Sequence, residues 1–433
     1  MPHLATSIRT STLLLALAAT SAPGQAQVPA YGALELQARS NLLVNDEGWN
    51  LPPGSSFNSI TASINADGWV SFPVQVVPVA GQAGSSAGIW RGRNGVGAIV
   101  ARHDPLPGGE VSIADRTSIN DAGAVGYIIN RDFSSYSIWV FDPLAALSTQ
   151  VVLFPLTPAY VSNIDLSDAG VVGYQGRFGA NGRGFASTVP GAQPADSVIH
   201  VADSEINPAS PYVFLYSPAM NDARVIAGKV NVGTTSNAEI RLFAANGDST
   251  LLARNRAMDA ASPFQGFDNG LGVNDAGQVA VALNLADGGG RAVYRLQDGQ
   301  PPLKIARVGE HGITAIEFFA PAINADGLVA FRGQSAGGQA IFVGDGSGAP
   351  VRVLGKGDAV QTDLGPGRIG QHIDNPSSWP VFSGAPGINA HGDIVAIAGL
   401  HPDGDTQIEW GSGVIVAWAA GDPIFADGFE APP

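Results

Sequence analysis

The sequence predicts an all-β fold built from repeated units, and three observations support this prediction. A ten-residue turn motif recurs seven times along the 433 residues. Segments with the patterning of β-strands follow each copy. Outside the N-terminal segment, no stretch sustains the apolar period of an amphipathic helix. The 56 glycines and 30 prolines also favour many short strands joined by turns.

The turn motif consists of Asn or Ser, two further residues and Gly, as in SINADGWVSF at 63–72. The side-chain oxygen accepts hydrogen bonds from N–H groups ahead of it, and Gly adopts positive φ without steric cost. A β-branched strand then leaves the turn. Ser167 stands for Asn in the third copy, and Arg224 replaces Gly in the fourth, where we expect a strained or differently built turn. The structural turn residues are Asn65, Gly68, Asn120, Gly123, Gly170, Asn221, Asn274, Gly277, Asn324, Gly327, Asn389 and Gly392.

Further strands follow every turn. A second strand recurs in all seven copies, as in AEIRLF (238–243), and a third recurs in six, as in STLLARN (249–255). The seventh copy stops at its second strand, SGVIVAW (412–418), while a segment that resembles the missing third strand, ALELQARS (33–40), precedes the first turn.

A repeat divided between the two termini is what a closed ring requires, because the N-terminal strand then leaves no open edge. We therefore predict a seven-bladed β-propeller in which residues 33–40 complete the last blade. An open stack, which would need distinct capping repeats, and a two-sheet arrangement are the alternatives.

The chain divides into three parts. The first 26 residues are expected to be a signal peptide, with Arg9 as the basic residue, a short apolar run at 13–19 and cleavage after Ala26. That run is too short for a membrane span, and no later segment is long enough. Residues 27–421 form the repeat domain and residues 422–433 a DPIFADGFE-type tail. We expect a secreted or periplasmic protein.

Composition excludes several functions. The net charge of −15 and the absence of a basic run argue against nucleic acid and anionic membrane surfaces as partners. The absence of cysteine excludes disulfides, thiolate metal sites, a cysteine nucleophile and lipidation at cysteine. We expect a monomer without a cofactor.

Two phrases, PAINADGLVAFRG (321–333) and QAIFVGDG (339–346), resemble exported bacterial tandem-repeat proteins with an N-x-x-G-x-V-A-F core. INDAGAVGY and SDAGVVGY resemble extracellular HAF-type repeats, although His-Ala-Phe itself is absent. The tail resembles a short ending found on exported proteins of Gram-negative bacteria. The resemblance implies an exported β-propeller-like fold of unknown function, and it supplies no catalytic residues.

Candidate ligand-binding residues lie where loops break the repeat. The longest insertion lies between the sixth and seventh turns and contains His372 and Trp379, and Trp49 lies in another loop. These aromatic rings are candidates for stacking against a saccharide. Trp90, Trp139 and Trp418 lie on predicted second strands, so we expect them in the core.

A weak candidate for a metal site is the loop with His401, Asp403 and Asp405, whose oxygen ligands at alternating positions resemble the start of a calcium loop. No acidic residue completes an EF-hand there, so an ordinary polar loop is favoured. The repeated Asn-Asp turns would line one rim with carboxylates suited to a cation or a hydroxylated ligand, although turn formation alone explains them.

No nucleophile elbow, zinc-binding helix or P-loop is present in the sequence, and no catalytic residue is assigned. We therefore expect an exported, non-enzymatic binding or interaction scaffold for a saccharide or a protein partner. One alternative is a carbohydrate-active hydrolase or lyase with carboxylates at the central channel. The other is a structural surface protein.

Overall fold

The all-β prediction is confirmed: the described part of the chain contains 33 strands and no helix. No helix there is long and apolar enough to cross a membrane. The predicted signal peptide and the C-terminal tail lie outside the described residues. The computed structural model describes residues 27–420 except 41–47, 58–59, 78–85, 106–108, 110, 133–134, 152–158, 192–196, 287 and 372–379.

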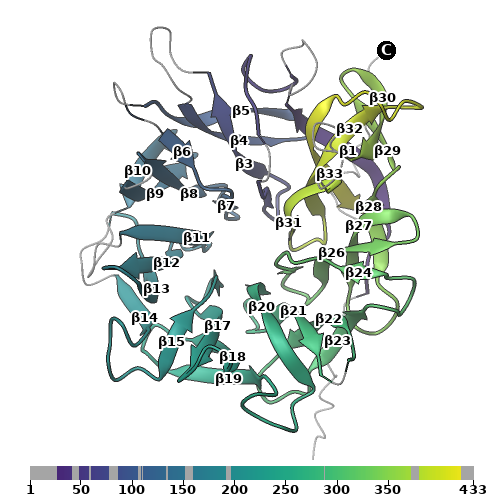
Figure 1. Ribbon diagram of the computed structural model, residues 1–433. Helices are drawn as coiled ribbons and strands as arrows, with labels where there is room; N and C mark the ends of the chain where they lie inside the picture. Colours follow the sequence, from purple (N-terminus) through teal and green to yellow (C-terminus); the bar gives the residue numbers. More distant parts are fainter. Residues whose placement is uncertain are drawn as a thin grey trace, which may run out of the picture.

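The strands pair into seven sheets, numbered 1 to 7 in chain order, which follow one another around a ring (Figure 1). The strands of the first three sheets are: in sheet 1, β2 (Ser63–Ile64), β3 (Val70–Val76), β4 (Ser86–Arg93) and β5 (Val96–His103); in sheet 2, β6 (Val111–Ile113), β7 (Ser118–Ile119), β8 (Val125–Arg131), β9 (Ser135–Asp142) and β10 (Leu147–Val151); in sheet 3, β11 (Tyr160–Leu166), β12 (Val172–Phe178), β13 (Gly182–Thr188) and β14 (Val198–Ala202).

Sheets 4 to 6 continue the same antiparallel order. Their strands are: in sheet 4, β15 (Tyr212–Leu215), β16 (Ala219–Met220), β17 (Ile226–Val232), β18 (Ala238–Phe243) and β19 (Ser249–Arg254); in sheet 5, β20 (Phe264–Val273), β21 (Val279–Leu285), β22 (Arg291–Leu296) and β23 (Leu303–Arg307); in sheet 6, β24 (Ala315–Ile316), β25 (Ala322–Ile323), β26 (Val329–Ser335), β27 (Gly338–Gly344) and β28 (Val351–Gly355).

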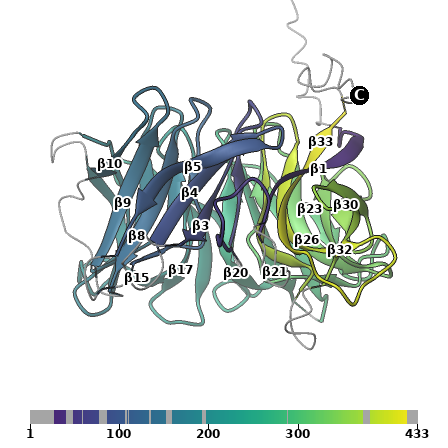
Figure 2. The same cartoon turned by 90° about the horizontal axis from the view of Figure 1, so that it is seen from above.

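Sheet 7 joins the two ends of the chain. The N-terminal strand β1 (Tyr31–Arg39) pairs antiparallel with β33 (Gly411–Ala419), as the divided repeat predicts, and the two lie side by side in Figure 2. Apolar side chains of sheets 7 and 1, among them Val395, Val414 and Phe72, share one core cluster that also holds Trp90 and Trp418. This packing closes the ring.

Sheet 7 departs from the regular form of the other six. Its remaining strands are β29 (Ala359–Thr362), β30 (Gly365–Gly370), β31 (Phe382–Ile388) and β32 (Ile394–Pro402). β29 pairs with β1, and β30 pairs with both β29 and β32, so β1, β33, β32, β30 and β29 form a closed circuit of paired strands. The prediction of a seven-bladed β-propeller is therefore wrong: the arrangement is propeller-like with six regular blades, and the insertion between the sixth and seventh turns folds into the last sheet.

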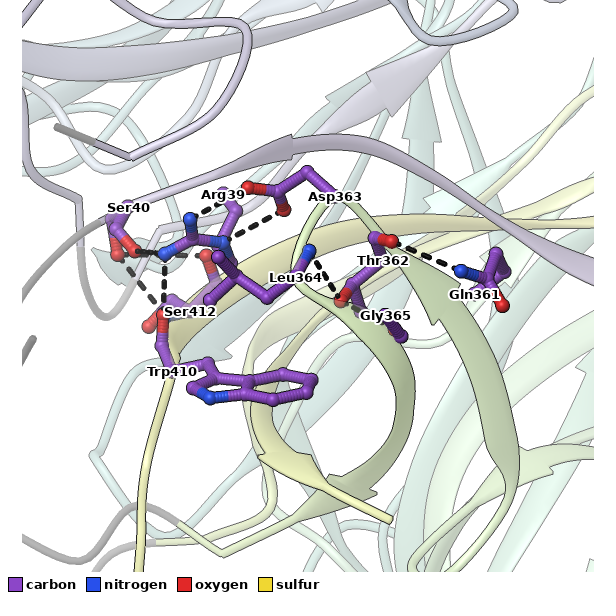
Figure 3. Close-up of polar contacts among 9 residues, drawn as sticks. All are labelled: Arg39, Ser40, Gln361, Thr362, Asp363, Leu364, Gly365, Trp410 and Ser412. Carbon is purple, nitrogen blue, oxygen red and sulfur yellow. Dashed lines mark hydrogen bonds and ion pairs between the residues drawn. The ribbon is translucent and has the colours of Figure 1, made fainter. Parts of the chain in front are cut away.

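A buried ion pair fixes this closure (Figure 3). The Arg39 guanidinium, 1% exposed, binds both carboxylate oxygens of Asp363 at 2.9 and 2.7 Å. Its remaining nitrogen donates to the Trp410 carbonyl at 2.8 Å. Arg39 thus connects the end of β1, the β29–β30 turn and the start of β33.

The repeated turns bind one another in a ring. Within each turn the side-chain oxygen accepts a backbone N–H four residues ahead, as from Trp69 to Asn65 at 2.8 Å. The Asn65 side-chain amide then donates to the backbone oxygen of Asn120, the next turn residue, at 2.9 Å. The same contact runs from Asn120 to Ser167, Asn221 to Asn274, Asn274 to Asn324, Asn324 to Asn389, and Asn389 back to Asn65.

Ser167 has no side-chain amide to donate to the next turn. There, backbone N–H groups that bind aspartate side chains of the following turn link the neighbouring sheets. The Asp168 N–H donates to the Asp222 carboxylate at 2.6 Å, and the Asp222 N–H to Asp275 at 2.8 Å. Arg224 keeps the left-handed conformation of the glycine that it replaces, with φ 59°. Its guanidinium donates to Ser187 Oγ at 3.0 Å, an interaction that glycine has no side chain to make.

The innermost strand of most sheets is interrupted before the turn, as between β15 and β16 or between β24 and β25. The carbonyls exposed by an interruption are bound by a long polar side chain of the preceding sheet. Gln175 donates to the Leu215 and Tyr216 carbonyls, Lys229 Nζ to the Phe267 carbonyl, and Arg332 to the Gly384 carbonyl. These bridges shape the wall of the central channel.

Candidate functional site

Two adjoining cavities lie in the channel wall of sheets 2 to 4. Their volumes are 390 and 320 Å³, and both are lined by Tyr160, Ser162, Asn163 and Ser217. We call them together the double cavity. Tyr160 lies at the end of β11 remote from the turn, so the double cavity opens at the face opposite the ring of Asn turns.

The first cavity lies between sheets 2 and 3. Ser112, Ile113, Ala114 and Asp115 line it from the interrupted inner strand of sheet 2, and Asn130 and Tyr136 from β8 and β9. Asn130 is 9% exposed, and among the described residues its side-chain oxygen, itself almost inaccessible to solvent, has no hydrogen-bond partner. A buried unpaired acceptor of this kind costs free energy.

The wall between the two cavities bulges at Asn163. The register of β11 against β12 shifts between Ser162 and Ile164, and Asn163 adopts φ 51°. Asn tolerates this left-handed conformation better than most residues. The Asn163 amide donates to Ser162 Oγ at 3.2 Å, and Ser162 donates to Gln175 at 2.9 Å. Gln175 in turn binds sheet 4, so hydrogen bonds hold the polar wall in place.

The second cavity lies between sheets 3 and 4 and combines cations with aromatic rings. Arg183 stacks 3.8 Å from the centre of the Phe214 ring, and the Arg177 guanidinium lies 5.5 Å from that of Tyr160. Lys229 Nζ lies 4.0 Å from the Tyr216 ring, and burial lowers its pKa. No carboxylate of the described residues lines this cavity.

Three acidic residues of sheets 3, 5 and 6 are engaged in ion pairs with arginines. Asp165 binds Arg116 at 2.7 Å and Glu317 binds Arg332 at 2.6 Å. Burial raises the pKa of Asp165, and Arg116 opposes this shift. Asp268 similarly binds Arg291 at 2.5 Å. Each of these carboxylates therefore contacts an arginine of its own sheet or of a neighbouring one.

The residues singled out in the sequence lie elsewhere. Trp49 is half-buried, forms backbone hydrogen bonds with Arg39, and packs against the apolar core of sheets 6 and 7. His372 and Trp379 lie outside the described residues. The structure therefore gives Trp49 a packing role and does not bring it to the double cavity.

In the candidate calcium loop, His401, Asp403 and Asp405 each contact other protein groups. The His401 ring nitrogens face the carbonyls of Ile408 and Gln371 at 2.8 and 2.7 Å. Asp403 binds Arg368 at 2.6 Å, and Asp405 accepts the Gln407 N–H at 2.8 Å. Within the described ranges no group of three His, Asp or Glu side chains is placed to hold a metal ion.

Sequence reasoning missed the double cavity because its lining residues are ordinary polar and aromatic residues of irregular inner strands. The signal present in the sequence is the departure from the repeat at Tyr160, Asn163 and Phe214-Leu-Tyr216. These residues precede the third and fourth turns, but other copies also carry aromatic residues there, such as Phe318 and Phe319 before the sixth turn, so the sequence does not single them out.

The fold is all-β and propeller-like, with a polar and aromatic double cavity between its sheets. Residues 17–404 match the Family of unknown function (DUF7453), and the chain belongs to that family. No curated protein matches the sequence.

Two solved structures share the general arrangement at low similarity. One is a puromycin-hydrolyzing peptidase of Mycobacterium tuberculosis, with 11% identity, a TM-score of 0.47, and coverage of 85% of this chain and 53% of that one. The other is the oligogalacturonate lyase of Vibrio parahaemolyticus, with 8% identity, a TM-score of 0.48, and coverage of 90% and 98%. The chain thus spans about half the length of the peptidase, and the activities named belong to those proteins.

Proposed function

We propose that this protein is an exported, non-enzymatic scaffold that binds a saccharide in the double cavity. In this proposal the sheets act together as one closed ring, which holds the cavity wall rigid. The observation that carries the proposal is the pair of adjoining cavities with a polar and aromatic lining.

The chemistry of the lining supports a hydroxylated ligand. Tyr136, Tyr160, Phe214 and Tyr216 offer ring faces of the kind on which sugar rings pack through their C–H groups. Ser162, Asn163, Ser217 and Asn269 add hydroxyl and amide groups that both donate and accept hydrogen bonds. This combination of aromatic area with a few fixed polar groups is typical of small-molecule sites.

A hydrolase or lyase remains the alternative proposal, and the lining favours binding over it. Glycoside hydrolysis generally uses two carboxylates about 5 to 10 Å apart. Asp115 is the one carboxylate among the described residues that line the double cavity. The nearby Asp165 is engaged with Arg116 and with the Met220 N–H at 3.0 Å.

A glycan array probed with the purified protein tests the proposal. Tyr160→Ala and Asn163→Gly remove a ring and an amide, and glycine keeps the positive φ of position 163. We expect both variants to bind the selected glycan at least about ten-fold more weakly. Phe318→Ala is the matched control, because Phe318 is an exposed ring (78%) outside the double cavity.

The rival locations are tested in the same assay. His372→Ala and Trp379→Ala remove the ligand candidates of the insertion, and Trp49→Ala removes the third. Loss of binding in these variants, with full binding in Tyr160→Ala, would place the site outside the double cavity. Binding to no glycan on the array would reject the saccharide proposal, and turnover of a bound glycan would favour the hydrolase or lyase.

A further inference from the structure

Two arginines face each other directly across a strand pair in the second cavity. Arg177 of β12 and Arg183 of β13 are register partners, and Tyr160 of β11 is the partner of Arg177 on the other side. Side chains of directly opposed residues point to the same face of a sheet, and like charges in this relation repel each other. The fold therefore holds two positive charges together on the cavity side of sheet 3.

The carboxylate of Asp203 attracts Arg183 but does not bind its guanidinium. Within the described part of the chain neither guanidinium forms an ion pair with a carboxylate. Asp203 accepts the Arg183 backbone N–H at 2.8 Å rather than a guanidinium N–H. Among the described residues, the polar contact of the Arg183 guanidinium is with the Asn181 carbonyl, at 3.0 Å.

Arginines of other sheets are arranged differently. Arg116, Arg291 and Arg332 of sheets 2, 5 and 6 all bind carboxylates, at 2.5 to 2.7 Å. The chain has 37 acidic residues against 22 basic ones, so carboxylates that could pair with arginines are abundant. Arg177 and Arg183 at the second cavity instead lie beside aromatic rings, which position a guanidinium without neutralising its charge.

Resting on the proposed function, we propose that the saccharide is acidic and that Arg177 and Arg183 bind its negatively charged group. Carboxylate and sulfate groups share the chemistry that two adjacent guanidinium groups recognise, namely anionic oxygens that accept several N–H donors. The Tyr160 and Phe214 rings, which lie against these arginines, would pack on the sugar ring that bears the charge. An anion between the two arginines would also remove their mutual repulsion.

The test compares neutral glycans with uronate-containing and sulfated glycans, using the full mature protein and titration calorimetry. We expect an acidic glycan to bind best, with affinity that falls as NaCl rises from 50 to 500 mM, which shortens the Debye length about three-fold. Arg177→Gln and Arg183→Gln are each expected to weaken acidic-glycan binding by about ten-fold or more.

Arg368→Gln is the matched control, because Arg368 is an exposed arginine of sheet 7 (45% side-chain exposure) and the charge change is the same. Thermal unfolding of the ligand-free variants checks that they fold. Because one of two repelling charges is removed, we expect the melting temperature to stay unchanged or to rise slightly. The carboxylated and sulfated arms identify which anion is preferred.

The outcomes separate the two proposals. If neutral glycans bind as tightly as acidic ones, or if the arginine variants bind acidic glycans like the unaltered protein, the acidic-ligand inference is overturned while the saccharide proposal stands. If no glycan of any charge binds, the saccharide proposal fails and this inference fails with it.

Discussion

The side-chain amide of Asn389 donates to the backbone oxygen of Asn65 at 2.9 Å, although 324 residues separate them in sequence. This contact is the last step of the ring of turn residues, and it stands beside the strand pairing of β1 with β33. The Asn389 side-chain oxygen also accepts the N–H groups of His391 and Asp393 at 3.1 and 2.9 Å. One buried side chain thus completes its own turn and links it to the first.

Replacement of this residue is expected to weaken the whole ring. Asn389→Ala removes these contacts at a site that is 4% exposed, and leaves the Asn65 oxygen without its amide donor. We expect a loss of about 2 to 3 kcal/mol in the free energy of unfolding, measured by urea denaturation. Asn246→Ala, in an exposed turn of sheet 4, is the control and should cost less than about 1 kcal/mol. Equal losses in the two variants would contradict a special role for the ring.

Ser167, where the ring of turn residues lacks an amide donor, allows the reverse test of adding one. Asn at this position would keep an acceptor for the Val171 N–H, now bound by Ser167 Oγ at 3.0 Å, and would add the amide that the other turns direct at the next sheet. Ser167→Asn is therefore expected to raise the free energy of unfolding by about 0.5 to 1 kcal/mol. Differential scanning calorimetry measures the change, and a lower melting temperature would show that the site has no room for the amide.

The ion pair between Arg39 and Asp363 is expected to matter far more than an exposed pair. Asp363→Asn leaves a buried guanidinium, 1% exposed, without its counter-charge, which typically costs about 3 to 5 kcal/mol. Asp403→Asn breaks the exposed pair with Arg368 and should cost less than about 1 kcal/mol. Denaturant midpoints of both variants give the comparison. A small effect of Asp363→Asn would mean that water replaces the lost partner.

Asp222 is expected to make stability depend on pH. Burial, with smaller contributions from Asp168 and Asp275, raises its pKa to about 6. The folded state then binds its proton more tightly than the unfolded chain does, so this contribution is full below about pH 4 and is lost as pH rises through 6. Because the Asp222 residue as a whole is still exposed to solvent, we expect this effect on the free energy of unfolding to stay below about 1 kcal/mol. Asp222→Asn should flatten the melting temperature between pH 4 and 6.5, and an unchanged slope would contradict the assignment.

His103 is expected to act in the opposite direction. Burial, together with Arg131, lowers its pKa to about 4, and its Nε2 lies 3.0 Å from the Tyr127 hydroxyl. The unfolded chain binds the proton more tightly, so stability is full above about pH 6.5 and falls as pH drops towards 4, by on the order of 2 kcal/mol. His103→Gln should reduce this loss of unfolding free energy at low pH. Urea midpoints at pH 7 and pH 4.5 measure it, and equal losses in both proteins would refute the effect.

The periodic part of the fold could be predicted from the sequence because local physics determines it. An Asn at the start and a Gly with positive φ, 77° at Gly68, specify each tight turn. Alternating apolar residues specify the strands, and the division of one repeat between the termini predicts the pairing of β1 with β33. The unlike form of sheet 7 was not predicted, because β29 and β30 find their partners only through distant contacts.

The candidate site depended on tertiary structure. Tyr160, Asn163 and Phe214 are unremarkable residues in the sequence, and they line one cavity only because sheets 3 and 4 pack side by side. The opposition of Arg177 and Arg183 follows from strand register, which a shift of one residue would abolish. The sequence alone determined a ring of repeated β-units, since each unit is encoded locally. The double cavity and its charge arise between units, where only packing and register decide which side chains meet.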